Sequence, residues 1–351
     1  MTSVAVIGGG AWGTALALVA AGNGCATTLW VRDPATARHL TGVRENPRLP
    51  GVALPAALRI TAELERVRDA AVWVLAVPAQ ALGAVCQQLA RLAAAPRPLV
   101  IAAKGIEVSS GRLMSQLAGA ALGGFPLAIL SGPTFADEVA AGKPTAVSVA
   151  VDRQDVATAD IVTAAFGTAV FRPYVSFDPV GVQVGGAVKN IVAIACGISQ
   201  GRGLGENARA AIITRGLSEA SRLAVALGGR ADTLLGLAGV GDLSLTCTSL
   251  RSRNMALGQA LGEGGTLREV LRTSRGVVEG VESARAVVVL ADRLGVDMPI
   301  CQAVCAILHD TADIDATIRN LLMRPFTAES DAHRPSAGAP GAGLSVLPPA
   351  R

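Results

Sequence analysis

Three glycines near the start of the chain constrain its fold more than any other feature. Gly8, Gly10 and Gly13 follow the apolar run Val4–Ile7 and precede an alanine-rich stretch, so the order is strand, glycine loop, helix. In such a unit the first glycine permits a tight turn, the second lets the backbone approach a pyrophosphate, and the third lets helix and strand pack closely. Free N–H groups at the helix start also favour phosphate. The loop, with Ala11 beside it, therefore predicts a dinucleotide-binding domain.

The remaining first half alternates short apolar runs with helical stretches, which predicts βαβ units and a mostly parallel, doubly wound sheet. After about residue 180 the strand-like runs disappear and helical periodicity continues. We therefore expect a Rossmann-type α/β domain over 1–180 and an all-helical domain over 181–327. Residues 328–351 are rich in Ala, Pro, Gly and Ser, which predicts a disordered tail. Strands are expected at 4–7, 27–31, 71–77, 99–103, 127–130 and 146–151, and helices at 13–22, 79–95, 112–121, 182–200, 206–228, 249–262, 280–294 and 299–310.

The composition limits the classes of partner. The net charge of +4 comes from scattered residues with few aromatics, which argues against nucleic-acid binding. The uncharged stretches 70–90 and 113–136 are long enough to cross a bilayer, but Pro, Gly or Gln residues interrupt them, so we expect strand–helix pairs and no membrane span. No secretory leader precedes Val4, which predicts a cytoplasmic protein. The six cysteines and three histidines show no metal-ligand spacing, so no metal is expected.

The end of the second expected strand bears on the choice of cofactor. An acidic residue there binds the ribose 2′-hydroxyl of NAD, whereas an arginine accommodates the 2′-phosphate of NADP. Arg32 stands first and Asp33 follows it. This order favours NADPH with NADH tolerated, and the alternative is that Arg32 is a solvated surface charge.

Longer motifs along the chain resemble those of one known family. They are Ala103-Lys-Gly-Ile-Glu107, Ser131-Gly-Pro-Thr-Phe-Ala136, Gly186-Ala-Val-Lys-Asn190, Gly236-Leu-Ala-Gly-Val-Gly-Asp242, Thr246-Cys-Thr248, Ser252-Arg-Asn254 and Val277-Val-Glu279. Over about residues 4–325 the chain is similar to bacterial NAD(P)-dependent glycerol-3-phosphate dehydrogenases. A small departure is Gly9, where such proteins often carry Ala.

The resemblance implies a reaction and a set of site residues. Family members reduce dihydroxyacetone phosphate to sn-glycerol 3-phosphate, the precursor of the phospholipid backbone, and the resemblance also favours a homodimer. By correspondence with the motifs, Lys189 would be the catalytic residue. The substrate-binding positions would be Lys104, Gly132, Thr134, Lys189, Asn190, Asp242, Ser252, Arg253 and Asn254. The cofactor-binding positions would be Trp12, Arg32, Lys104, Ala136, Arg253, Val277 and Glu279.

The chemistry gives these residue types a reason. Hydride addition to a ketone builds negative charge on the carbonyl oxygen, which a lysine ammonium can neutralise and protonate. Lys189 lies in the apolar stretch 182–198, a costly place for a charge unless it is paired or functional. We expect Asn190 and Asp242 to hold its ammonium and the substrate hydroxyl. Lys104 follows a strand, and we expect it to stabilise charge rather than transfer the proton.

The substrate phosphate is a dianion, and Arg253 is the best candidate to bind it because guanidinium binds phosphate oxygens bidentately. Ser252 and Asn254 would add donors near the start of a helix, whose N-terminus favours an anion. The same Ser and Asn are also typical helix caps, and the two roles are compatible.

Two other functions stay open at this stage. The first is a β-hydroxyacid-type reductase with the same architecture and a carboxylate substrate, which would not be expected to carry both the Gly-Asp and the Ser-Arg-Asn motifs. The second is a non-catalytic NADP(H)-sensing protein, which predicts decayed catalytic positions. Lys189, Asn190, Asp242 and Arg253 are all present, which favours the dehydrogenase.

Overall fold

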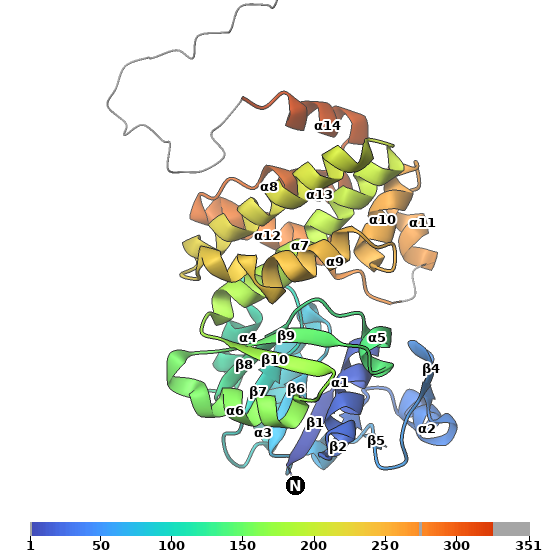
Figure 1. The fold of residues 1–351 in the computed structure, drawn as a ribbon, viewed down its shortest axis with the longest axis vertical. Coiled ribbons are helices and arrows are strands. Elements are labelled where there is room, and N and C mark those ends of the chain that lie inside the picture. Colours follow the sequence, from blue (N-terminus) through green and yellow to red (C-terminus); the bar gives the residue numbers. More distant parts are fainter. Residues whose placement is uncertain (1, 274–275, 326–351) are drawn as a thin grey trace, which may run out of the picture.

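The computed structural model describes residues 2–273 and 276–325, which form two domains stacked along the long axis of the molecule (Figure 1). The first domain is built on a β-sheet and the second consists of helices. This arrangement confirms the predicted fold class, a Rossmann-type sheet followed by an all-helical domain. The tail expected at 328–351 lies outside the described residues.

One eight-stranded sheet forms the centre of the first domain. Its strands are β1 (Ser3–Ile7), β2 (Ala26–Trp30), β5 (Arg59–Thr61), β6 (Val72–Leu75), β7 (Leu99–Ile101), β8 (Leu127–Ser131), β9 (Thr145–Val151) and β10 (Phe171–Ser176). They stand in the order β10-β9-β8-β7-β6-β1-β2-β5, and all neighbours are parallel except β8 and β9. The order reverses between β1 and β6, where sheets of this kind bind their ligands.

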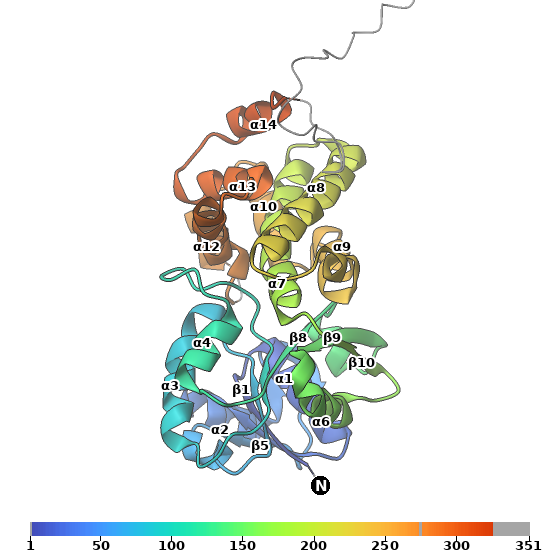
Figure 2. The same cartoon turned by 90° about the vertical axis from the view of Figure 1, so that its left-hand side faces the viewer.

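Helices cover both faces of the sheet, as Figure 2 shows from the side. One face carries α1 (Ala11–Gly22) and α6 (Val156–Phe166), and the other carries α3 (Leu82–Leu92) and α4 (Met114–Ala121). Each face has its own buried apolar cluster, and both clusters rest largely on Ala, Val and Leu. Since β1 starts at the pole far from the helical domain and runs toward it, the carboxyl ends of the parallel strands face that domain (Figure 1).

Four short strands are absent from the sequence prediction. The hairpin of β3 (Glu45–Asn46) and β4 (Leu49–Ala53), together with β5, lacks an apolar run, and β4 itself contains Pro and Gly. The strand β10 carries Pro173 and lies at the edge of the sheet, where proline is tolerated. Half-exposed edge strands give a weaker hydrophobic signal than buried central ones.

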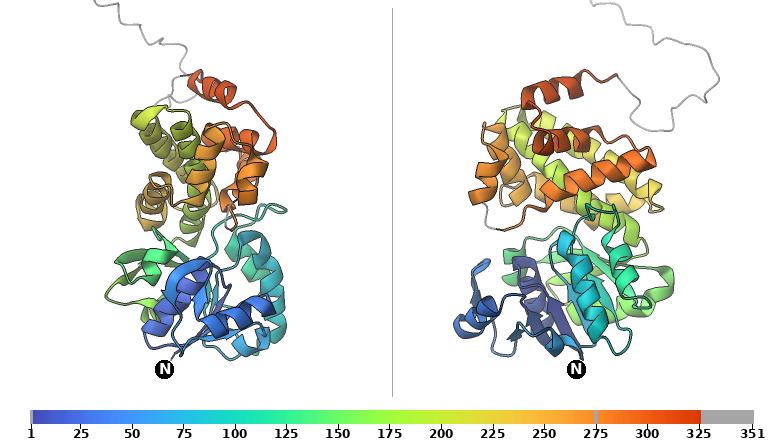
Figure 3. Two further views of the ribbon diagram at one scale, coloured as in Figure 1. Left: turned by 90° about the vertical axis from the view of Figure 1, so that its right-hand side faces the viewer. Right: turned by 180° about the vertical axis from the view of Figure 1, so that it is seen from behind.

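The second domain is organised around one central helix, α7 (Pro179–Gly201), seen from two further sides in Figure 3. The helices packed against it are α8 (Gly205–Ala226), α9 (Asp242–Cys247), α10 (Arg253–Gly262), α12 (Glu279–Leu294) and α13 (Pro299–His309). The sequence pattern does not predict three short helices of this domain, α9, α11 (Leu267–Thr273) and α14 (Ile314–Leu322).

Helix α7 is the one described helix whose length and apolar composition would allow it to cross a membrane, but 94% of its apolar window is buried inside the protein. Its contact with α10 is made through glycine. A Cβ added to Gly197 would lie 2.1 Å from the carbonyl oxygen of Met255, and one at Gly258 would lie 2.1 Å from that of Ile194. The two backbones therefore pack directly on each other, and α7 is the core of the helical domain.

Candidate functional site

The glycine loop leaves space and donors for phosphate. An added Cβ at Gly8, where φ is +127°, would lie 2.5 Å from the carbonyl oxygen of Ala76, and one at Gly13 would lie 1.9 Å from that of Gly8. A Cβ at Gly10 would meet no atom within 4 Å. Helix α1 begins beside Gly10 without a side-chain cap, so its first N–H groups are open to an anion. The loop therefore fits the pyrophosphate of a dinucleotide.

Polar groups behind the loop hold it in place. Asn46 of β3 donates hydrogen bonds to the carbonyl of Gly9 (3.2 Å) and the hydroxyl of Thr14 (2.7 Å), which ties the β3–β4 hairpin to the loop. Ala11 and Trp12 form the first turn of α1. The indole Nε1 of Trp12 is buried and has no hydrogen-bond partner among the described residues.

Arg32 and Asp33 differ in how their side chains are used. The Asp33 carboxylate accepts hydrogen bonds from the N–H groups of Ala35 (3.3 Å) and Thr36 (2.9 Å) and so caps helix α2 (Pro34–Val43). The hydrogen bond from the Thr36 hydroxyl (2.5 Å), followed by the one from the Thr36 N–H, lowers the pKa of Asp33. Arg32 is exposed just beyond β2. Both side chains are exposed, but the Asp33 carboxylate is hydrogen-bonded to the start of α2.

Three charged side chains meet between the two domains. The Lys189 ammonium on α7 lies 2.5 Å from Oδ1 of Asp242, and the Lys104 ammonium, just beyond β7, lies 2.7 Å from Oδ2 of the same carboxylate. Lys189 also donates to the hydroxyl of Thr246 (3.1 Å), and Lys104 donates to the carbonyl of Gly132 (3.2 Å). Asp242 is fully buried, and Lys189 is 9% exposed. One carboxylate therefore positions two ammonium groups.

The burial of this cluster shifts its proton affinities. Burial lowers the pKa of Lys189 to about 8, the charge of Asp242 opposes that shift, and the Lys104 ammonium reinforces it. Burial alone would raise the pKa of Asp242, but the two ammonium groups outweigh it and hold that pKa below its ordinary value. The carboxylate is therefore ionised at neutral pH, and Lys189 exchanges its proton in a range suited to acid–base catalysis.

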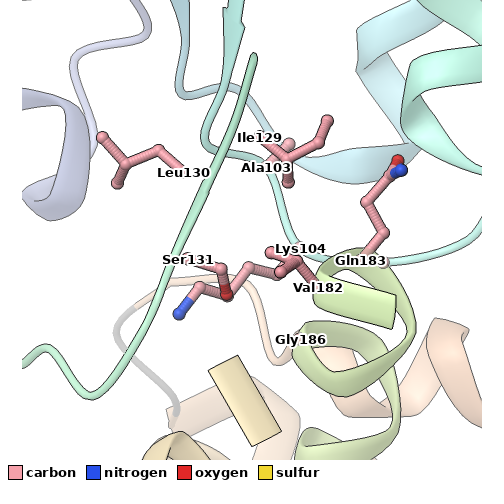
Figure 4. A pocket seen from close by; sticks show the side chains of 9 residues that line it. Ala103, Lys104, Ile129, Leu130, Ser131, Val182, Gln183 and Gly186 are labelled. Carbon is pink, nitrogen blue, oxygen red and sulfur yellow. The ribbon is translucent and has the colours of Figure 1, made fainter. Parts of the chain in front are cut away.

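A glycine of α7 makes room for the Lys104 side chain. Figure 4 shows Lys104 and Ser131 beside Gly186, in a pocket between the strand ends and α7. A Cβ at Gly186 would lie 3.2 Å from the Ser131 hydroxyl and 3.5 Å from Cγ of Lys104. A methyl group here would touch Lys104 at an ordinary contact distance and press slightly on Ser131, so the space for a longer side chain is already filled.

Asn190 and Asn254 form a second buried contact. Asn254 of α10 donates to the side-chain oxygen of Asn190 (2.9 Å) and accepts from the N–H of Gly280 at the start of α12 (3.0 Å). The expectation that Asn190 holds the Lys189 ammonium is therefore wrong, because its amide faces α10. Adjacent residues of a helix point about 100° apart, so Lys189 and Asn190 reach different neighbours.

The Ser252-Arg-Asn254 motif stands at a helix start, as expected, although α10 begins at Arg253 rather than 249. The Ser252 hydroxyl accepts from the N–H of Met255 (3.3 Å) and caps the helix. Arg253 is exposed beside Glu279, the first residue of α12. Burial raises the pKa of Glu279 to about 7, against the lowering effect of the Arg253 charge.

The other predicted positions lie around this centre. Gly132, with φ of +151°, follows β8, and its carbonyl accepts from both Lys104 and the Thr134 hydroxyl (3.3 Å). Ala136 begins the short helix α5 (Ala136–Ala140), and Val277 is 48% exposed just before α12. The direct hydrogen-bond network thus joins Lys104, Gly132, Thr134, Lys189 and Asp242, whereas Ser252, Arg253, Val277 and Glu279 stand outside it.

Comparison with known families shows to which family the chain belongs. Residues 3–157 match the profile of the NAD-dependent glycerol-3-phosphate dehydrogenase N-terminus, and residues 178–319 match that of the C-terminus. The chain belongs to the NAD-dependent glycerol-3-phosphate dehydrogenase family. The two matched segments correspond to the sheet domain and the helical domain, so the family's two parts meet at the lysine cluster.

Individual relatives extend over nearly the whole length. The glycerol-3-phosphate dehydrogenase [NAD(P)+] of Rhodospirillum rubrum is 52% identical over 328 residues, which are 93% of this chain and 93% of the relative. That of Parvibaculum lavamentivorans is 47% identical over 93% of this chain and 98% of its own length. The crystal structure of glycerol-3-phosphate dehydrogenase from Coxiella burnetii matches with a TM-score of 0.88 at 38% identity, covering 92% of this chain and 99% of that one.

The structure of the present chain adds residues to which the sequence analysis gives no role. Thr246 accepts a hydrogen bond from Lys189 and donates one to the backbone carbonyl of Asp242 (2.6 Å). Its spacing of four residues from Asp242 on one helix was a usable signal, because such residues share a helix face. Asn46 carried no comparable signal, and Gly186 stands in a family motif that does not show its contact with Lys104 and Ser131.

Proposed function

We propose that this chain interconverts dihydroxyacetone phosphate and sn-glycerol 3-phosphate with NADPH or NADH. The observation that carries the proposal is the pair of ammonium groups on one buried carboxylate, placed where the strand ends meet the helical domain. Reduction of a ketone needs an acid beside the carbonyl oxygen. Membership of the glycerol-3-phosphate dehydrogenase family indicates which ketone is the substrate. When bound, the nicotinamide supplies the hydride.

Lys189 is the proton donor of this proposal. As negative charge builds on the carbonyl oxygen, the Lys189 ammonium passes a proton to that oxygen, and in the oxidative direction the neutral amine takes it back. A pKa of about 8 makes both forms accessible near neutral pH. Asp242 and Thr246 fix the position of its Nζ through two hydrogen bonds.

Lys104 is assigned the electrostatic part of the work. It is less buried than Lys189, with 16% of its side chain exposed against 10%. Its ammonium is fixed by Asp242 and the Gly132 carbonyl, so it can stabilise negative charge on the substrate from a set position.

The substrate phosphate is assigned to Arg253 and the start of α10. The exposed guanidinium can bind phosphate oxygens bidentately, and the helix N-terminus adds its dipole and free N–H groups. Ser252 caps the helix and Asn254 holds α10 against α7 and α12, so both side chains orient this phosphate site.

Two features favour NADPH over NADH. Asp33 is bound to the start of α2, and Arg32 is exposed at the end of β2, where a 2′-phosphate would lie. The fit of Gly8, Gly10 and Gly13 to a pyrophosphate is independent of this choice. We also propose that the enzyme is cytoplasmic and works as a homodimer. Light scattering of the purified protein would test the dimer.

The test is turnover. With NADPH and dihydroxyacetone phosphate, absorbance at the nicotinamide band should fall, and sn-glycerol 3-phosphate should appear in equal amount. Oxidation with a 2-keto acid but not with this ketone would replace the proposal by the hydroxyacid reductase. Cofactor binding without turnover on either would favour the sensing protein.

A further inference from the structure

Arg251 stands immediately before the phosphate-site motif and reaches across to the sheet domain. It belongs to the connection between α9 and α10, on the helical side. Its partners, Asp137 and Glu138, lie in α5, directly after the motif that contains Gly132 and Thr134. The contact therefore joins two segments more than 110 residues apart, both of which border the proposed substrate site.

Arg251 contacts three side chains of the other domain, those of Phe135, Asp137 and Glu138, and we call this contact the clamp. One Arg251 nitrogen donates to Glu138 (2.5 Å) and the other to Asp137, and the guanidinium lies over the Phe135 ring, 4.5 Å from its centroid. A guanidinium held on two carboxylates and one ring face is restrained in position and in orientation. A single exposed ion pair of the ordinary kind fixes neither.

The charges of the clamp also matter for an anionic substrate. Asp137 and Glu138 place two carboxylates next to the strand-end loop, and Arg251 together with Lys143, 3.6 Å from Glu138, balances them. Without Arg251 the segment beside the site would carry excess negative charge. A dianionic phosphate would then be bound less tightly.

We propose that Arg251 is a positioning residue that holds the Ser252-Arg-Asn254 phosphate site against the Gly132–Ala136 loop. It does not contact the reacting atoms, and it acts through Arg253, whose backbone follows it by two residues. The proposal rests on the function proposed above. Its specific consequence is that loss of Arg251 weakens binding of the phosphorylated substrate while leaving the proton-transfer step intact.

The test compares Arg251→Gln with the wild-type enzyme. The KM for dihydroxyacetone phosphate should rise about five- to tenfold, the combined size expected of two partly exposed ion pairs and a cation–π contact, with kcat within about twofold of wild type. Arg251→Lys keeps the charge but loses the planar guanidinium, so its KM should lie between those of the wild type and Arg251→Gln. The matched control is Arg324→Gln, which removes an exposed arginine paired with Asp297 (2.6 Å) at the far end of the helical domain and should leave KM unchanged.

Asp137→Asn with Glu138→Gln removes the clamp from the other side. If the clamp acts as a unit, adding Arg251→Gln to this double variant should raise KM by much less than it does in the wild type. An unchanged KM in soluble Arg251→Gln protein, or a fall in kcat alone, would overturn the proposal. If Arg251→Gln does not fold, the Lys variant and the carboxylate variants decide it in the same way. Absence of turnover by the wild type would instead refute the proposed function.

Discussion

The two lysines that share Asp242 come from regions of different construction. Lys104 follows a parallel strand, in a domain whose ligand-binding surfaces are made by backbone and glycine. Lys189 lies in the middle of a buried helix, and its ammonium donates hydrogen bonds to Asp242 and Thr246 of α9. The sheet domain therefore provides shape, through positions where a side chain cannot fit, together with the charge of Lys104. The helical domain provides the proton donor, a Lys189 ammonium whose pKa burial has lowered.

The glycine loop and the buried ion cluster should tolerate different substitutions. A glycine loop fails through steric collision, whereas a buried ion cluster fails through an uncompensated charge. Damage to the first should show in cofactor affinity, and damage to the second should show in the rate or in stability. The following predictions separate these outcomes.

Lys189→Ala should have the largest effect. Loss of a general acid should lower kcat by about a thousandfold, in the middle of the range for such catalysis. NADPH affinity, followed by fluorescence, should stay within about twofold, because Lys189 belongs to α7 and the pyrophosphate site to the start of α1. Arg324→Ala, which removes an exposed cation at the far end of the helical domain, is the control and should keep its rate. A normal rate for Lys189→Ala would end the assignment of proton transfer to this residue.

Asp242→Asn should show the cost of an uncompensated buried charge. Two ammonium groups would then face each other without their shared carboxylate. Breaking a buried ion pair in this way typically lowers the free energy of unfolding by about 3–5 kcal/mol, which urea titration measures. The exposed pair of Arg230 and Asp232 provides the control, since Asp232→Asn should change stability little. Equal unfolding midpoints for the two variants would contradict the account.

Gly13→Ala should damage the sheet domain alone. Its Cβ would lie 1.9 Å from the Gly8 carbonyl oxygen, so the helix must move away from the loop. Strain of about 1–3 kcal/mol at this contact corresponds to roughly a ten- to hundredfold loss of NADPH affinity. Gly22→Ala, at the other end of α1, meets no atom within 4 Å and should bind NADPH normally. If both variants bind equally, close packing at Gly13 is not what shapes the loop.

Arg32→Ala should have the smallest effect. Removing one charge-assisted contact to a 2′-phosphate should weaken NADPH binding about tenfold and leave NADH binding unchanged. The ratio of the two dissociation constants is the measurement. A ratio that does not move would take Arg32 out of the cofactor site.

The sequence predicts these two regions unequally. The glycine loop and the buried strands can be predicted from local patterns. The first strand, the loop and the start of the first helix, for example, all lie within residues 4–17. Lys189 was conspicuous because its flanks are apolar. The direction of Asn190, the support that Thr246 gives and the clamp at Arg251 depend on contacts between distant segments, and a sequence does not show which side chains these bring together. The hairpin of β3 and β4 was missed for a further reason, since its residues carry no apolar alternation.

The central claim is that Lys189 transfers the proton, and the pH dependence of kcat/KM tests it most directly. Burial lowers the Lys189 pKa to about 8 from an ordinary value near 10.5. Reduction needs the ammonium, so its rate should be high below pH 8 and fall above it. Oxidation needs the neutral amine, so its rate should rise through the same range. Wild type should therefore show opposite breaks near pH 8 in the two directions, and the residual activity of Lys189→Ala should show neither. Identical breaks in the wild type and the variant would contradict the account.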